Sequence, residues 1–169
     1  MSIAIDTNVL VRILIQDPSA PEQCAAARRL VADATAAGEP LLVSLCALLE
    51  TEWVLRSRYK VNRKAMATAF ISMLETPGIE FEHDATVEEA LYLLDQFPSA
   101  DFADCLLAAG ATHLGRSRFV TFDAGAARLP RVELLQSAPP APKHPQSAMS
   151  GLPRSSAFGS AKLCKSKHL

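Results

Sequence analysis

A few acidic residues are the best candidates for chemical activity in this chain of 169 residues. Asp6 directly follows a short apolar run at the N-terminus, and Asp123 closely follows another such run. Asp101 and Asp104 are three residues apart, so on a helix they share one face. Carboxylate oxygens are ligands that Mg²⁺ and Mn²⁺ prefer, and a metal held by them can activate water for attack on a phosphate. The pattern therefore permits metal-dependent hydrolysis of phosphodiester bonds.

Two glutamates in an apolar stretch add a further candidate. Glu50 and Glu52 are two residues apart, which places them on nearly opposite faces of a helix. Only one of the two can therefore point into a site shared with the aspartates.

A structural interpretation of the aspartates stays open beside the chemical one. Aspartate is a favoured helix cap, and Asp6, Asp101 and Asp123 each precede a segment that could be a helix or turn. Asp104 could be a surface residue in a first helical turn, where the helix dipole favours an acid. These roles are compatible with metal binding.

Alternating strands and helices are predicted to position these acids. Strands are expected at 3–5, 41–43, 79–82, 119–121 and 132–135, and helices at 9–15, 22–37, 44–58, 62–75, from 86 onward and at 101–114. Apolar strands that alternate with helices are typical of a parallel sheet covered on both faces. In such a sheet the ligand site lies beyond the carboxyl ends of the strands, where Asp6 and Asp123 fall.

Residues 137–169 differ in composition from residues 1–136. Five of the 17 Lys and Arg residues lie in this segment, whereas all 18 Asp and Glu residues lie before it. The segment is also rich in proline and serine, a composition that cannot bury enough apolar surface to fold. We therefore expect one folded domain over residues 1–136, followed by a disordered basic tail.

Several function classes are excluded by what the sequence contains. No apolar run approaches the roughly 18 residues needed to span a membrane, and the N-terminus has no secretory pattern. The four cysteines are widely and irregularly spaced, so neither a zinc site nor a disulfide framework is expected. There is no glycine-rich loop that would bind a nucleoside triphosphate. A cytoplasmic protein with reduced thiols is predicted.

Four segments of residues 1–136 resemble the motifs of PIN-domain ribonucleases, in the order and spacing of that family. They are residues 3–10 (IAIDTNVL), 43–56 (VSLCALLETEWVLR), 100–108 (ADFADCLLA) and 120–123 (VTFD). Within that family, the motifs resemble those of the VapC-type toxins of bacterial toxin–antitoxin pairs. The resemblance implies a three-layer α/β/α sandwich with a mainly parallel central sheet and a Mg²⁺- or Mn²⁺-dependent endoribonuclease. It also implies an RNA substrate, a homodimer and a cognate antitoxin protein that holds the enzyme inactive.

The same resemblance assigns roles to individual residues. The acidic quartet of the family corresponds to Asp6, Glu50, Asp104 and Asp123, with Asp6, Asp101, Asp104 and Asp123 as metal ligands, and Thr7, Asn8 and Thr121 as supporting polar residues. Glu52 matches no site position. The segment 137–169 has no counterpart in the family pattern.

A local basic run could contact the RNA backbone. We hypothesise that Arg56, Arg58 and Lys60 bind phosphates, although residues 1–136 are net acidic and do not attract RNA strongly. The alternative is that these cations stabilise the carboxyl end of a helix.

Two other functions compete with the ribonuclease. A phosphatase of the haloacid-dehalogenase type needs a second aspartate two residues after the first, but Asn8 occupies that position. A non-catalytic PIN-like module that binds RNA or protein is the stronger alternative. The complete set of acids argues against this module without excluding it.

Overall fold

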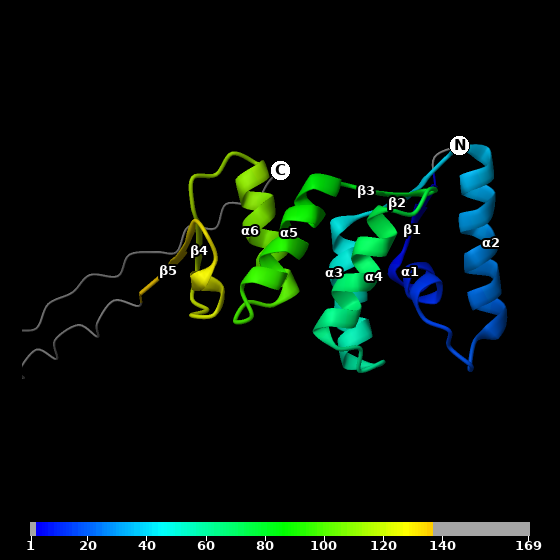
Figure 1. Cartoon of the computed structure of the whole chain (residues 1–169), viewed down its shortest axis with the longest axis horizontal. Helices are drawn as coiled ribbons and strands as arrows, with labels where there is room; N and C mark the ends of the chain where they lie inside the picture. Colours follow the sequence, from blue (N-terminus) through cyan, green and yellow to red (C-terminus); the bar gives the residue numbers. More distant parts are fainter. Residues whose placement is uncertain (1–2, 137–169) are drawn as a thin grey trace, which may run out of the picture. The chain divides into compact units, whose positions relative to one another are not determined.

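The computed structural model describes residues 3–136, and the segment for which a disordered basic tail was predicted, 137–169, lies outside the described residues. The elements are β1 (Ile3–Ile5), α1 (Thr7–Leu14), α2 (Pro21–Ala37), β2 (Leu41–Val43), α3 (Leu45–Ser57), α4 (Arg63–Leu74), β3 (Ile79–Phe81), α5 (Asp84–Gln96), α6 (Phe102–His113), β4 (Phe119–Thr121), the 3₁₀ helix η1 (Ala126–Arg128) and β5 (Val132–Leu134). Every predicted strand and helix is present, with ends that differ by a few residues at most (Figure 1).

The strands pair in parallel, as predicted for an α/β fold. In the first sheet β2 lies between β1 and β3, and Leu41 is beside both Ile3 and Ile79. Figure 1 shows β2 and β3 running in the same direction, each leading into the helix at its carboxyl end. The second sheet pairs β4 with β5, with Phe119 beside Val132.

The described strands are divided between two sheets, whereas one central sheet was expected. Each observed pair joins two strands that follow one another in the chain. A single chain connection is therefore enough to bring the two strands of a pair together. The strands are also less covered than a fully buried sheet would be. Ile3 is 40% exposed, Leu42 37% and Val120 48%.

Side-chain caps start four of the helices at the predicted residues. Asp6, Ser44, Asn62 and Asp101 each have extended backbone and accept a hydrogen bond from an amide in the first turn of the helix that follows. Gly38 ends α2 in the left-handed conformation, with a φ of 66°, which a residue without a side chain adopts at low cost. These local signals explain why the helix boundaries could be read from the sequence.

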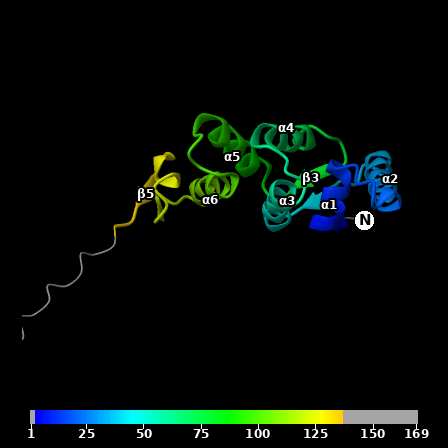
Figure 2. The same ribbon diagram turned by 90° about the horizontal axis from the view of Figure 1, so that it is seen from below.

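One continuous apolar core connects the first sheet with the carboxyl-terminal helices. It contains Ile5, Val43 and Phe81 from the three strands, together with buried side chains of α3, α4, α5 and α6. The rings of Phe70 in α4 and Phe102 in α6 have centroids 5.2 Å apart. Figures 1 and 2 both show α1 beside α2 and α5 beside α6. The core thus reaches the residue that directly follows Asp101.

Cys24, Cys46 and Cys105 are free thiols, and Cys164 lies outside the described residues. Within residues 3–136, none of the helices has both the length and the apolar character required to cross a bilayer.

Candidate active site

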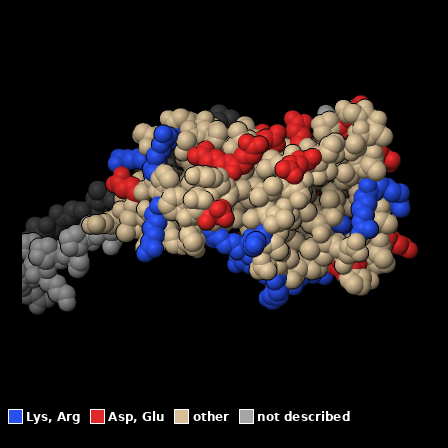
Figure 3. Space-filling model, viewed as in Figure 1, with Lys and Arg blue, Asp and Glu red and all other residues tan. Residues whose placement is uncertain are grey.

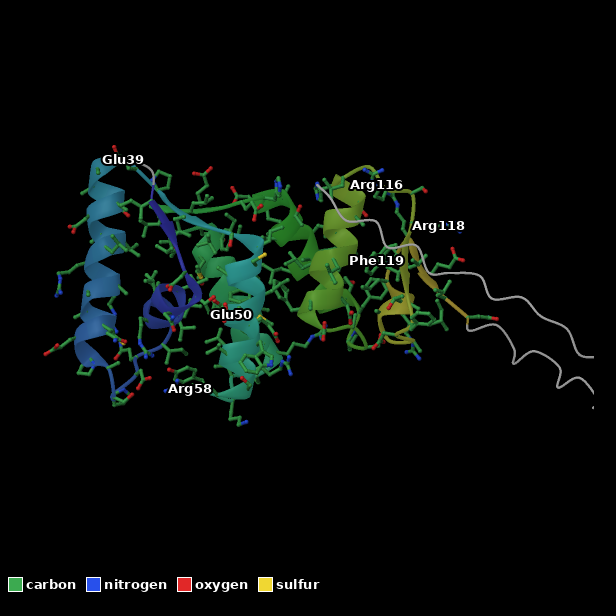
Figure 4. The ribbon with its side chains drawn as sticks, turned by 180° about the vertical axis from the view of Figure 1, so that it is seen from behind. Glu39, Glu50, Arg58, Arg116, Arg118 and Phe119 are labelled. Carbon is green, nitrogen blue, oxygen red and sulfur yellow. The ribbon has the colours of Figure 1, made fainter. Side chains whose placement is uncertain are left out.

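The carboxyl end of β1 brings Asp6, Thr7 and Glu50 together, and we call these residues the Asp6 group. Asp6 is exposed and caps α1, with Oδ1 accepting a hydrogen bond from the Val9 amide at 2.9 Å. The buried Thr7 donates through Oγ1 to Glu50 Oε2 at 2.6 Å. Figure 4 shows the Glu50 side chain on α3 directed toward α1. A bond between residues 43 positions apart therefore joins two of the sequence motifs.

Glu50 and Glu52 have the different environments that their spacing predicted. Glu50 is exposed, whereas Glu52 is 7% exposed and forms an ion pair with Arg56 at 2.9 Å. Glu52 is therefore committed to its own helix, which agrees with leaving it out of the site.

The start of α6 and the loop after β4 hold the other three acids, which we call the Asp104 group. Asp101 and Asp104 form a reciprocal capping box. The Asp104 amide donates to Asp101 Oδ1 at 2.9 Å, and the Asp101 amide donates to Asp104 Oδ2 at 3.2 Å. Asp123 Oδ1 accepts from the amides of Gly125 and Ala126, which start η1. The capping roles considered for Asp6, Asp101 and Asp123 are confirmed.

Supporting polar residues flank both groups. Thr121 Oγ1 accepts a hydrogen bond from the Asp123 amide at 3.0 Å, which fixes the turn that presents the Asp123 carboxylate. Asn8 is exposed in the first turn of α1, beside Asp6.

Crowding of negative charge distinguishes the Asp104 group. Asp104 is half-buried, and this burial is the main cause that raises the pKa of its carboxyl group. The charges of Asp101 and Asp123 raise that pKa further, while the hydrogen bond with the Asp101 amide lowers it. A divalent cation would reverse this repulsion, and the oxygen donors are of the kind that Mg²⁺ and Mn²⁺ take. The donor chemistry of the group therefore fits such a metal.

The structure does not gather all of the predicted ligands into one cluster. Within residues 3–136, no three His, Cys, Asp or Glu side chains converge closely enough to hold a metal ion. Of the predicted quartet, Asp6 follows a strand of the first sheet, whereas Asp123 follows a strand of the second.

The basic run at the end of α3 is engaged in local contacts. Arg56 pairs with Glu52, which is the main cause that raises the pKa of its guanidinium, and the charge of Asp101 adds to this effect. Arg58 lies over the ring of Tyr59, with Cζ 5.5 Å from the centroid. Lys60 Nζ donates to the Ser57 carbonyl at 2.6 Å, the interaction expected of a cation at a helix carboxyl end. Figure 3 shows Lys and Arg gathered near this end of α3 and α4, with Asp and Glu over β3 and the start of α5.

A polar network around Asp17 was not predicted from the sequence. Asp17 is 8% exposed, and its Oδ2 accepts from Arg12 Nη1 at 2.9 Å and from Tyr59 Oη at 2.7 Å. Ser19 donates to Oδ1 through both its hydroxyl and its amide. The bonds from Ser19 and then Tyr59 hold the pKa of the Asp17 carboxyl group far below its usual range. No local sequence pattern signals this contact, because Tyr59 lies 42 residues from Asp17 in the chain.

Arg63 is a second residue whose role only the fold shows. Its guanidinium, at the start of α4, donates to the carbonyls of Leu94, Phe97 and Ala100. Ala100 directly precedes Asp101, so Arg63 fixes the loop that leads into the Asp104 group. These partners are 31 to 37 residues from Arg63 in the chain, so no local pattern signals this role.

Comparison with known proteins gives one family. The profile of the PIN domain matches residues 3–132. No curated protein matches the chain. The PIN domain is generally a nuclease fold, and its members usually use Mg²⁺ or Mn²⁺.

Proposed function

The chain belongs to the PIN-domain family, and we propose that it is a metal-dependent endoribonuclease that acts as the toxin of a toxin–antitoxin pair. The observation that carries this proposal is that an acidic residue stands at each of the four positions of the family's acidic quartet, all within the matched segment. Asp6 follows β1, Glu50 is on α3, Asp104 is in the first turn of α6 and Asp123 follows β4. Carboxylates at the carboxyl ends of strands are placed where α/β proteins bind ligands.

The proposed cofactor is Mg²⁺ or Mn²⁺, with Asp6, Asp101, Asp104 and Asp123 as the residues that would hold it. When bound, the metal supplies a more acidic water and polarises the phosphate. The chain's own bonds prepare the ligands. The capping box holds the Asp101 and Asp104 carboxylates side by side, and the turn at Thr121 orients Asp123.

Glu50 has a different proposed role, because its carboxylate is held by the Thr7 hydroxyl and not by a backbone cap. An exposed carboxylate in a fixed orientation is suited to accept a proton from an attacking water. The supporting roles of Asn8 and Thr121, and phosphate contacts of Arg56, Arg58 and Lys60, belong to the same proposal.

The motifs that resemble VapC-type toxins also suggest the biological setting. We propose a cytoplasmic homodimer that is inhibited by a cognate antitoxin. Support for this part rests on the order and spacing of the four motifs in residues 3–123.

A second candidate function is a PIN-domain module that binds RNA or a protein without cleavage. The specific observation in its favour is that, within residues 3–136, no three His, Cys, Asp or Glu side chains form a cluster that could hold a metal ion.

RNA cleavage by the full chain tests the two candidates. The wild type, Asp6→Asn and Asp104→Asn would be incubated with structured cellular RNAs in Mg²⁺, Mn²⁺ or chelator. Asp33→Asn, at an exposed position of α2, is the matched control. Discrete cleavage that requires metal, persists in Asp33→Asn and is lost in the other two variants is expected.

A thermal shift assay on the same proteins separates loss of activity from loss of metal. The wild type and Asp33→Asn should melt at a higher temperature in millimolar Mn²⁺, because a ligand that binds only the folded state stabilises it. A folded wild type that binds RNA, shows no metal-dependent shift and never cleaves would favour the binding module.

A further inference from the structure

A groove between α1 and α2 opens directly beside Asp6. It has a volume of about 740 Å³, within the range of small-molecule sites. Figure 1 shows the two helices side by side. The lining residues are Asp6, Asn8, Val9 and Arg12 from the α1 side and Gln23, Ala26, Ala27 and Leu30 from α2.

The α2 wall follows from helical spacing. Its lining positions recur at intervals of three and four residues, which places them on one face of the helix. Ala26 and Ala27 are small, so their side chains leave the space between the helices open. Val9 and Leu30 add aliphatic surface, against which a flat aromatic ring can pack.

The polar end of the groove is a fixed guanidinium. The Arg12 side chain is 18% exposed. Its Nη1 donates to Asp17 Oδ2 and to Tyr59 Oη, both at 2.9 Å. Its Nε donates to Gln23 Oε1 at 3.1 Å. These three bonds are made by Nη1 and Nε of the guanidinium. A donor held in place by three bonds loses little entropy when it binds a ligand.

Charge favours a neutral occupant over a phosphate. The Arg12 charge is balanced by Asp17, and Asp6 adds a negative charge at the mouth of the groove. A phosphate would therefore meet a net negative site, whereas an uncharged ring with acceptor atoms could take hydrogen bonds from Arg12 and the Gln23 amide.

We propose that this groove binds one unpaired nucleobase of an RNA, adjacent to the bond cleaved at the Asp6 side of the active site. The inference rests on the proposed ribonuclease function and adds to it the part of the substrate that the enzyme reads. It explains why Arg12, Asp17 and Tyr59, which lie outside the acidic motifs, form a partly buried network that fixes one wall of the groove.

Binding of short RNAs tests the proposal without relying on catalysis. Single-stranded oligonucleotides that carry one abasic site at successive positions would be titrated against the full chain in chelator, with fluorescence anisotropy as the readout. Ala26→Trp fills the groove, and Ala32→Trp places the same side chain at an exposed position of the same helix outside the groove. Gln23→Ala is a second, milder variant that removes a polar contact without adding bulk.

In the wild type and in Ala32→Trp, an abasic site at one position should weaken binding by roughly tenfold, as expected for the loss of one base contact. In Ala26→Trp, binding of the intact RNA should be weaker by a similar factor, and the abasic site should add nothing further. Gln23→Ala should show a partial loss at the same position.

Failure of this inference is distinguishable from failure of the proposed function. If Ala26→Trp binds like the wild type, or keeps the full abasic penalty, the groove holds no base, whether or not the protein cleaves RNA. A wild type that binds none of these RNAs would overturn the base site as well. A position-specific penalty that disappears in Ala26→Trp, in a protein that never cleaves, supports the base site and overturns the nuclease.

Discussion

Asp17 and Asp104 are both partly or fully withdrawn from water, yet their surroundings act on them in opposite directions. Asp17 accepts hydrogen bonds from Arg12, Tyr59 and Ser19, and the pKa of its carboxyl group is lowered. Asp104 has two acidic neighbours and one amide donor, and its pKa is raised. Burial raises both pKa values, so the balance of partners decides the outcome.

The surroundings of Asp17 stabilise the folded state, whereas the surroundings of Asp104 place negative charges close to one another. The carboxylate of Asp17 is favoured by folding because Ser19, Tyr59 and Arg12 donate hydrogen bonds to it. The carboxylate of Asp104 is disfavoured by folding, and the nearby charges of Asp101 and Asp123 contribute to this. Carboxyl groups whose pKa is raised by acidic neighbours are typical of sites that bind cations or protons.

Asp17→Asn should have the largest effect on stability. The amide of asparagine would place a second donor against Arg12 and Tyr59, so we expect the Tm at pH 7 to fall by on the order of 5 °C. Because the pKa of Asp17 is lower in the folded state, its ionised carboxylate stabilises the fold at pH values above the ordinary pKa, near 3.8. This stabilisation is lost as the pH falls through the folded-state pKa. Thermal melts from pH 7 to pH 2 should therefore show a smaller acid-induced loss in the variant.

The exposed Asp33→Asn should change neither the Tm at neutral pH nor the acid profile. If Asp17→Asn melts like Asp33→Asn, the network around Asp17 does not stabilise the fold.

Tyr59→Phe removes one donor to Asp17 and one acceptor for Arg12 while keeping the ring. We expect a smaller loss than for Asp17→Asn, of about 0.5–1 kcal/mol in the free energy of unfolding, measured by urea denaturation. Tyr92→Phe is the matched control, because Tyr92 is 64% exposed on α5. Equal unfolding midpoints for the two variants would contradict this prediction.

Asp104→Asn should change stability in the opposite direction from Asp17→Asn. Because the folded-state pKa is raised, the charged form destabilises the fold at neutral pH, and the variant removes that charge. Asparagine keeps an oxygen that can accept the Asp101 amide. In chelator we expect the Tm at pH 7 to rise by on the order of 1–2 °C, with the difference disappearing as pH falls below the ordinary carboxyl range. A lower Tm at pH 7 would show that the capping box outweighs the repulsion.

The smallest expected effect is the influence of Asp123 on its neighbour. Asp123→Asn removes one of the two charges that raise the pKa of Asp104, so that pKa should move toward its ordinary value without reaching it, because burial remains the main cause. Carbon-detected NMR titration of the Asp104 carboxyl group in chelator measures this shift. An unchanged titration would mean that Asp123 does not act on Asp104.

Local signals explain how much of the fold could be predicted. Asp6, Ser44, Asn62 and Asp101 each cap the helix that follows, and the cap bond spans only three residues. The candidate aspartates were found for the same reason, because each one follows a strand or lies at the start of a helix. The expectation that Glu50 and Glu52 have different environments needed only the period of a helix.

Long-range contacts explain what could not be predicted. The bonds from Arg63 to Leu94, Phe97 and Ala100 join residues 31 to 37 positions apart, and Tyr59 reaches Asp17 over 42. No periodicity links such positions. The division of the strands into two sheets likewise depends on which edges pair, since all five are short, largely apolar segments that fit either arrangement.

The sequence by itself determined the elements, the caps and the acids that the motifs share, because these depend on residues a few positions apart. Only the tertiary structure decided which acids are neighbours, because this depends on how helices and sheets pack. It joined Thr7 to Glu50, brought Asp123 near Asp104, and joined Tyr59 to Arg12 and Asp17. Burial and charge act through space, so the pKa of one aspartate, Asp17, is lowered and the pKa of another, Asp104, is raised.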